Sequence, residues 1–141
     1  MSVYRKVFAM HADSVKVLII DDQPGIRRLL AEILIEEGYS VITAINGIEG
    51  IAKAQEMQPQ IILVDMKMPG IDGLETLREL KQRNPHEKVI MMTAYGELDL
   101  VNQARELGSV GYVTKPFDLL RLCGMIKDAS KIDGTMQLMI S

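Results

Sequence analysis

The sequence predicts an α/β fold: a doubly wound, five-stranded parallel sheet with helices on both faces. Short apolar runs alternate with amphipathic stretches five times along the 141 residues. The apolar runs are continuous instead of alternating with polar residues, which is typical of strands buried on both faces. Five such strand–helix units joined by right-handed crossovers produce a doubly wound sheet, and a chain of this length can bury one core.

Turn-forming and helix-capping residues mark where the predicted strands and helices begin and end. Pro24 lies where a helix start tolerates proline, and Gly38 lies where a helix stops. A second helix is expected after Asn46-Gly47, and the last helix from Phe117 to about Lys131. The predicted strands are VKVLII (15–20), YSVITAI (39–45), QIILVD (60–65), KVIMMT (88–93) and VGYVTK (110–115).

The composition is that of a single globular domain. Residues 15–131 form the expected domain, with an N-terminal extension at 1–14 and a tail at 132–141. A net charge of −3 gives no basic field for direct nucleic-acid binding, and no apolar run is long enough to cross a membrane. The single cysteine, Cys123, is expected to be a buried structural thiol and suits a reducing compartment, so we expect a cytoplasmic protein.

Charged and hydroxyl side chains stand where four of the predicted strands end. They are Asp21-Asp22, Asp65, Thr93 and Lys115. Ligands of doubly wound sheets bind at this edge. Three crowded carboxylates need a cation, and Mg²⁺ prefers oxygen ligands. Asp65 is then a candidate nucleophile for a phosphoryl group, although Asp21-Asp22 alone could instead cap the following helix.

These motifs together resemble a known family. The stretches DDQPGIRRLL, EEGY, DMKMPGIDG, MTAYGELD and KPFD resemble the receiver domains of bacterial two-component response regulators, and among them the single-domain receivers of sporulation phosphorelays. The resemblance covers 15 to about 131. It implies a flavodoxin-like (βα)5 fold with strand order 2-1-3-4-5.

The resemblance also implies roles for the site residues. Asp65 would be the phosphoacceptor, which takes a phosphoryl group from a phosphohistidine to form an aspartyl phosphate. Asp21, Asp22 and Asp65 would bind Mg²⁺ together with the backbone carbonyl of Lys67. Thr93 and Lys115 would contact the phosphoryl group, and the peptide bond before Pro116 would be cis.

Two further positions bear on switching and on the lifetime of the phosphoryl group. By the same resemblance, Tyr112 occupies the position of an aromatic switch that works with Thr93, but it could equally be a strand residue with its hydroxyl at the surface. Lys67 and Tyr95 follow the acceptor and Thr93 by two positions. Their long side chains are expected to shield the phosphoryl group from water.

The expected partners are a sensor histidine kinase, a histidine phosphotransfer protein, or both, acting on a monomer. The predicted partner surface is Gln23, Pro24, Gly25, Ile26, Pro116 and Phe117, with Leu29 as a further candidate. Ile26 and Phe117 are expected to be exposed apolar residues, with the core stripe of the first helix as the alternative for Ile26. Leu29 is expected to belong to that core stripe.

Other functions fit less well. A haloacid-type phosphatase needs a second acid where Lys67 stands, and a Rossmann dinucleotide site needs a glycine fingerprint that DDQPGI lacks. A receiver fragment of a larger DNA-binding regulator remains the alternative. The expected protein is not an enzyme in the usual sense, because it catalyses only its own phosphoryl transfer and slow dephosphorylation.

Overall fold

The computed structural model describes residues 14–94 and 96–131. Its single sheet has five parallel strands in the order β2-β1-β3-β4-β5, which is the order that the family resemblance implied. Residues 1–13, Tyr95 and the predicted tail at 132–141 lie outside the described residues, so the predicted extension and tail stay predictions. Among the described helices, none combines the length and the apolar character needed to cross a bilayer.

Strands and helices alternate strictly along the chain. The strands are β1 (Lys16–Ile20), β2 (Ser40–Ala44), β3 (Ile61–Asp65), β4 (Lys88–Ala94) and β5 (Gly111–Lys115). The helices are α2 (Pro24–Glu36), α3 (Gly47–Met57), α4 (Gly73–Arg83), α5 (Leu98–Glu106) and α6 (Leu119–Ala129).

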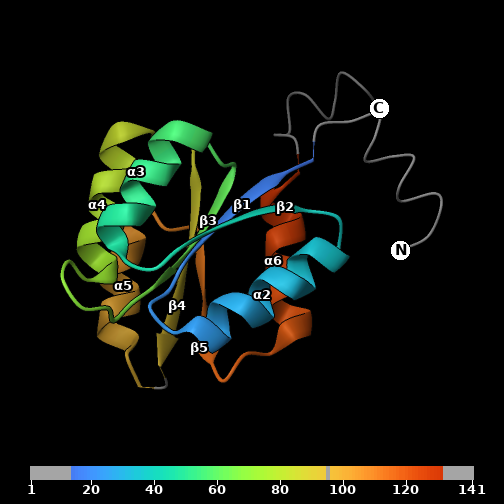
Figure 1. The fold of residues 1–141 in the computed structure, drawn as a ribbon. Helices are drawn as coiled ribbons and strands as arrows, with labels where there is room; N and C mark the ends of the chain where they lie inside the picture. The colour runs from blue at the N-terminus through green and yellow to red at the C-terminus, as the bar shows by residue number, and fades with distance from the viewer. Residues whose placement is uncertain (1–13, 95, 132–141) are drawn as a thin grey trace.

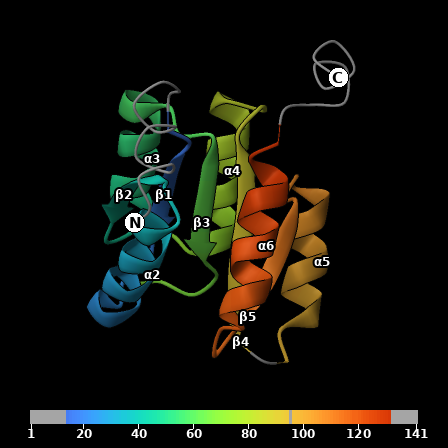
Figure 2. The same ribbon diagram turned by 90° about the vertical axis from the view of Figure 1, so that its right-hand side faces the viewer.

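The helices form two layers around the sheet. Figures 1 and 2 show α2 and α6 on one face and α3, α4 and α5 on the other. Each face has its own apolar core. In β1, Val17 and Ile19 join the core under α2 and α6, whereas Leu18 and Ile20 join the core under the other three helices. Alternate residues thus point to opposite faces, and both faces are covered, which explains the continuous apolar runs.

Acid and amide side chains define three helix starts. The side chains of Asn46, Asp72 and Asp118 accept hydrogen bonds from the backbone N–H three residues later. Such N-caps satisfy donors that have no partner within the helix. Asp118 therefore sets the start of α6 at Leu119, two residues after the Phe117 that the sequence pattern suggested.

The prediction that Leu29 belongs to the core stripe of α2 is wrong. The buried stripe of this helix consists of Leu30 and Leu34, one turn apart, and Leu29 lies about 100° around the helix from Leu30. Its exposed fraction is 42%, so it faces solvent and does not belong to the core.

The other apolar residues of the predicted partner surface are less exposed than expected. Ile26 and Phe117 are half-buried and pack against the core under α2 and α6. The expectation that both side chains are exposed is therefore wrong, and for Ile26 the structure shows the alternative, packing against the core. Cys123 is also half-buried, and burial raises the pKa of its thiol, as suits a structural cysteine.

A buried acid lies at the opposite end of the sheet from the predicted site. Glu87 precedes β4 and is only 4% exposed. The ammonium of Lys81 donates to the backbone carbonyls of Glu87, at 2.9 Å, and of Pro85, at 2.7 Å. Burial raises the pKa of the Glu87 carboxyl to about 7, against the opposing charge of Lys81. Ionised Glu87 is thus a cost to the fold at neutral pH.

Glu87→Gln should stabilise the protein at pH 8 but not at pH 4.5. Because the folded-state pKa lies above the ordinary value of 4.5, the folded state binds the extra proton, and wild-type stability falls as pH rises from about 4.5 to 7. Glutamine mimics the protonated acid, so its advantage should grow across this window to roughly 1–3 kcal/mol. Urea unfolding measures this advantage, with Glu106→Gln, at an exposed position of α5, as the control. An advantage that does not change with pH would contradict the assignment.

Candidate functional site

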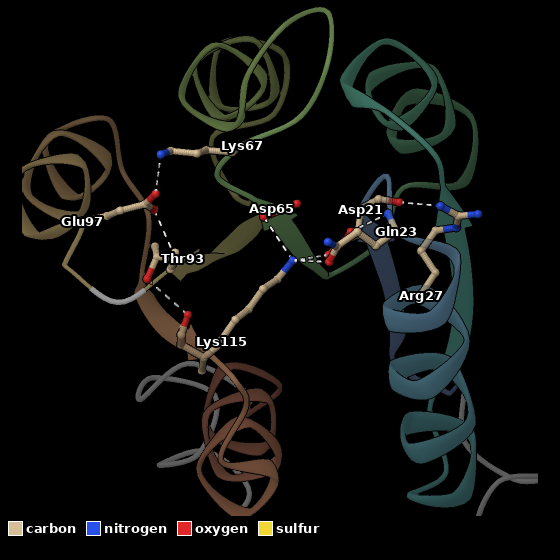
Figure 3. A network of polar contacts seen from close by, with 10 residues as sticks. Asp21, Gln23, Arg27, Asp65, Lys67, Thr93, Glu97 and Lys115 are labelled. Atoms are coloured by element: carbon tan, nitrogen blue, oxygen red, sulfur yellow. Dashed lines mark hydrogen bonds and ion pairs between the residues drawn. The ribbon is translucent and has the colours of Figure 1, made fainter.

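The predicted site residues meet at the carboxyl edge of the sheet. Asp21 follows β1 directly, Asp65 is the last residue of β3, and Lys115 is the last residue of β5. Thr93 lies one residue before the end of β4, between the strands that carry Asp65 and Lys115. Figure 3 shows these side chains converging from their strands. The sequence therefore predicted correctly which residues come together.

Three carboxylates form a compact cluster. Asp21 and Asp65 are buried, Asp22 is more accessible, and one oxygen from each lies within 4.8 Å of the others. Burial, and then the negative charge of Asp21, raise the pKa of Asp65 to about 6, while Lys115 opposes the rise. An oxygen-only cluster whose charges repel is a suitable donor set for a hard divalent cation such as Mg²⁺.

Lys115 links the two buried acids. Its Nζ lies 2.9 Å from Asp21 Oδ2 and 3.3 Å from Asp65 Oδ1, and it also contacts the side-chain oxygen of Gln23 at 3.3 Å. The peptide bond between Lys115 and Pro116 is cis, as the family resemblance implied. Since β5 is not a neighbour of β3, the lysine side chain reaches across the end of β4 to make these contacts.

Asp21 also fixes the start of α2. Its Oδ1 accepts a hydrogen bond from the Gln23 backbone N–H at 2.8 Å, and its backbone carbonyl accepts one from Arg27 Nη1 at 2.7 Å. The N-cap residue of α2 is Gln23, and its side chain makes no capping bond. Asp21 is therefore not a helix cap, and its second carboxylate oxygen is committed to Lys115.

The two residues of the predicted switch lie on adjacent strands. The Thr93 hydroxyl is buried and donates to the Val113 carbonyl at a long 3.5 Å. The ring of Tyr112 is half-buried against the core under α3, α4 and α5, and the Arg121 guanidinium lies 5.7 Å from its centroid. The ring is thus partly covered, while its rotation on activation stays a prediction.

A pocket of about 180 Å³ opens onto Asp65. Lysines flank it on two sides, Lys115 from β5 and Lys67 from the loop after β3. Its lining residues are Gln23, Asp65, Met66, Lys67, Ala94, Glu97 and Lys115.

Glu97 belongs to this pocket and was not predicted from the sequence. Its Oε1 pairs with Lys67 Nζ at 3.0 Å, and its Oε2 accepts the Ala94 backbone N–H at 3.2 Å. The signal that points to it is the glycine in TAYGELD: Gly96 has a φ of +90°, which turns the chain immediately before Glu97.

Gly73 holds the loop after β3 against the strand end. It is the first residue of α4, and its N–H donates to the Met66 carbonyl at 2.9 Å. A Cβ at this position would lie 2.4 Å from the Asp65 carbonyl oxygen and 2.7 Å from the Met66 Cα. Only glycine allows α4 to begin this close to Asp65.

Comparison with known proteins agrees with this geometry. The family described as "Response regulator receiver domain" matches residues 17–127, most of the chain. The chain belongs to the receiver domains of response regulators. This receiver is 44% identical to the sporulation initiation phosphotransferase F of Bacillus subtilis over 82% of its own length and 90% of that protein. It is 34% identical to the chemotaxis protein CheY of Listeria monocytogenes, over 82% and 98% of the two chains.

Solved structures show the same fold. The receiver superposes on the chemotaxis protein CheY4 of Vibrio cholerae with a TM-score of 0.78 and 28% identity, over 82% of this chain and 98% of that one. The sequence also matches parts of larger regulators. It is 37% identical to the DNA-binding transcriptional regulator NtrC of Salmonella typhimurium, but spans only 24% of that protein.

Gly73→Ala should destabilise the receiver by about 2 kcal/mol, because the added methyl group collides with backbone that cannot move aside as a flexible side chain would. Urea unfolding measures the loss. Gly25→Ala is the matched control: it is also in the first turn of a helix, but a Cβ there meets nothing within 4 Å. The control should be neutral or stabilising by up to about 1 kcal/mol. Equal effects of the two substitutions would contradict the close approach at Asp65.

Proposed function

We propose that this receiver accepts a phosphoryl group from a phosphohistidine onto Asp65 and relays it, or signals, through protein partners. The observation that carries the proposal is the position of Asp65: a buried carboxylate at a pocket flanked by two ammonium groups. In this role the protein is a phosphoacceptor that catalyses only its own phosphoryl transfer and slow dephosphorylation.

The transfer is a displacement at phosphorus. A carboxylate oxygen of Asp65 forms the new O–P bond while the P–N bond to the histidine breaks, and the electron pair stays on the ring nitrogen. The ring, protonated on its other nitrogen, leaves as neutral imidazole. Lys115 already contacts Asp65 and offsets charge on the phosphoryl oxygens. Thr93 offers a hydroxyl to one of those oxygens once it turns from Val113.

The residues that would hold Mg²⁺ are Asp21, Asp22 and Asp65, together with the backbone carbonyl of Lys67. The first three have carboxylate oxygens close enough to share one ion. When bound, the ion supplies positive charge to the carboxylates and to the incoming phosphoryl oxygens. Asp21 is already oriented by Gln23 and Lys115, so one ligand of the proposed ion is fixed in advance.

The proposed partners carry phosphorylatable histidines: a sensor histidine kinase, a phosphotransfer protein, or both. The similarity to the sporulation initiation phosphotransferase of B. subtilis supports a place within a phosphorelay. The proposed docking surface lies beside the pocket and includes Gln23, Gly25, Ile26, Pro116 and Phe117. Leu29 also belongs to it, because its side chain is exposed on α2. The protein would act as a cytoplasmic monomer, without direct contact to nucleic acid or membrane.

A second candidate is the receiver portion of a DNA-binding regulator. The partial match to NtrC favours it, because there the same domain occupies only 24% of a longer chain. Both candidates share the chemistry at Asp65 and differ only in what reads the phosphorylated state.

Asp65→Asn should abolish phosphorylation while leaving the fold intact. The amide is nearly isosteric but is not a nucleophile, and it removes a buried charge beside Asp21, so the melting temperature without metal should not fall. Labelling by acetyl phosphate in Mg²⁺ measures the reaction. Excess chelator should stop labelling of the wild type. Base-labile phosphate on the variant at the wild-type level, or undiminished wild-type labelling in chelator, would contradict the proposal.

Lys67→Asn should shorten the life of the phosphoryl group about tenfold. Lys67 lines the pocket, and its ammonium can pair with a phosphoryl oxygen and obstruct the approach of water. A tenfold change corresponds to about 1.4 kcal/mol of barrier. Loss of label in Mg²⁺ without a partner protein measures it. An unchanged half-life would refute shielding by Lys67; Tyr95, the other predicted shield, lies outside the described residues.

A further inference from the structure

Glu97 holds two hydrogen-bond donors at the mouth of the Asp65 pocket. One carboxylate oxygen pairs with Lys67, and the other accepts the Ala94 N–H, as Figure 3 shows for the lysine. The Glu97 side chain is only 11% exposed, whereas that of Lys67 is 75% exposed. The acid is therefore the covered member of the pair, and the lysine is the one that faces solvent.

Both donors belong to residues that line the pocket onto which Asp65 opens. Lys67, Ala94, Glu97 and Asp65 all line the same pocket of about 180 Å³. A carboxylate and a phosphoryl group are both oxygen anions that attract an ammonium and a backbone N–H. Glu97 therefore occupies donors that the phosphorylated aspartate would otherwise use, and its own charge lies near the incoming one.

We propose that Glu97 is a positioning residue that competes with the phosphoryl group for Lys67 and the Ala94 N–H. This rests on the proposed phosphorylation of Asp65. In the unphosphorylated protein Glu97 holds Lys67 to one side, and the dianion on Asp65 must draw the lysine away. Glu97 thereby lowers the rate of phosphorylation and shortens the life of the product.

The position of Glu97 in the chain gives this competition a structural consequence. It is the N-cap residue of α5, yet it makes no capping bond to that helix, because its side chain is directed back to the end of β4. Gly96, with a φ of +90°, precedes it. The Glu97 carboxylate thus joins the start of α5 to the end of β4 and to Lys67. If the carboxylate gives up these partners, the start of α5 loses this connection.

Glu97→Gln is the direct test. The amide keeps the size of the side chain and an oxygen for the Ala94 N–H, but it loses the charge that holds Lys67. With acetyl phosphate and Mg²⁺, the variant should be phosphorylated about three- to tenfold faster and should lose its label about threefold more slowly. Asp99→Asn is the matched control, because it makes the same charge change at an exposed position of α5 outside the pocket. It should leave both rates unchanged.

The double variant separates positioning from a general effect on stability. In a Lys67→Asn background, Glu97→Gln should no longer lengthen the life of the label, because the residue through which it acts is gone. If Glu97→Gln does not fold, Glu97→Asp, which retracts the charge by one methylene, should show the same slower loss. An unchanged or shorter lifetime, or a gain that persists without Lys67, would overturn the proposal. Failure of the wild type to label at all would instead refute phosphorylation at Asp65.

Discussion

The contact of Lys115 with both Asp21 and Asp65 is the interaction on which the site depends. It joins side chains from three strands, at 2.9 and 3.3 Å, across the end of β4. Two buried carboxylates this close repel each other, and loss of the lysine that they share would leave both charges uncompensated, at a cost of about 3–5 kcal/mol. The strand order and the register of β4 with β5 are thus linked to the chemistry, because only this arrangement brings the ammonium between the acids.

The site departs from what stability alone would select. Burial and the charge of Asp21 raise the pKa of Asp65 to about 6, so the fold holds an acid in a place where its ionised form is disfavoured. The free-energy cost of ionised Asp65 falls when a cation binds beside it or when a reaction consumes the carboxylate. Beside it lies a second set of charges, the pair of Lys67 and Glu97, in which Lys67 is exposed and Glu97 is largely covered. Asp21, Asp65 and Lys115 thus form an inner set of charges, and Glu97 with the exposed Lys67 forms an outer pair.

The sequence predicted the fold and the inner set well, because both depend on short-range signals. Continuous apolar runs specify strands covered on both faces, and parallel strands bring their terminal acids to one edge. Glu97 and Glu87 were missed because acids in or near loops look like solvated charges until tertiary contacts bury them. Leu29 was assigned to the core because the stripe of α2 was drawn one residue too wide; the exact face that a helix buries depends on its packing partner.

Mapping of the phosphorylated residue tests the central claim most directly. Borohydride reduces an aspartyl phosphate to homoserine, which mass spectrometry of peptides locates. After treatment with acetyl phosphate and Mg²⁺, the account predicts homoserine at position 65 and unmodified aspartate at 21 and 22. Homoserine at another aspartate, or phosphate retained on a hydroxyl side chain with none at Asp65, would contradict it.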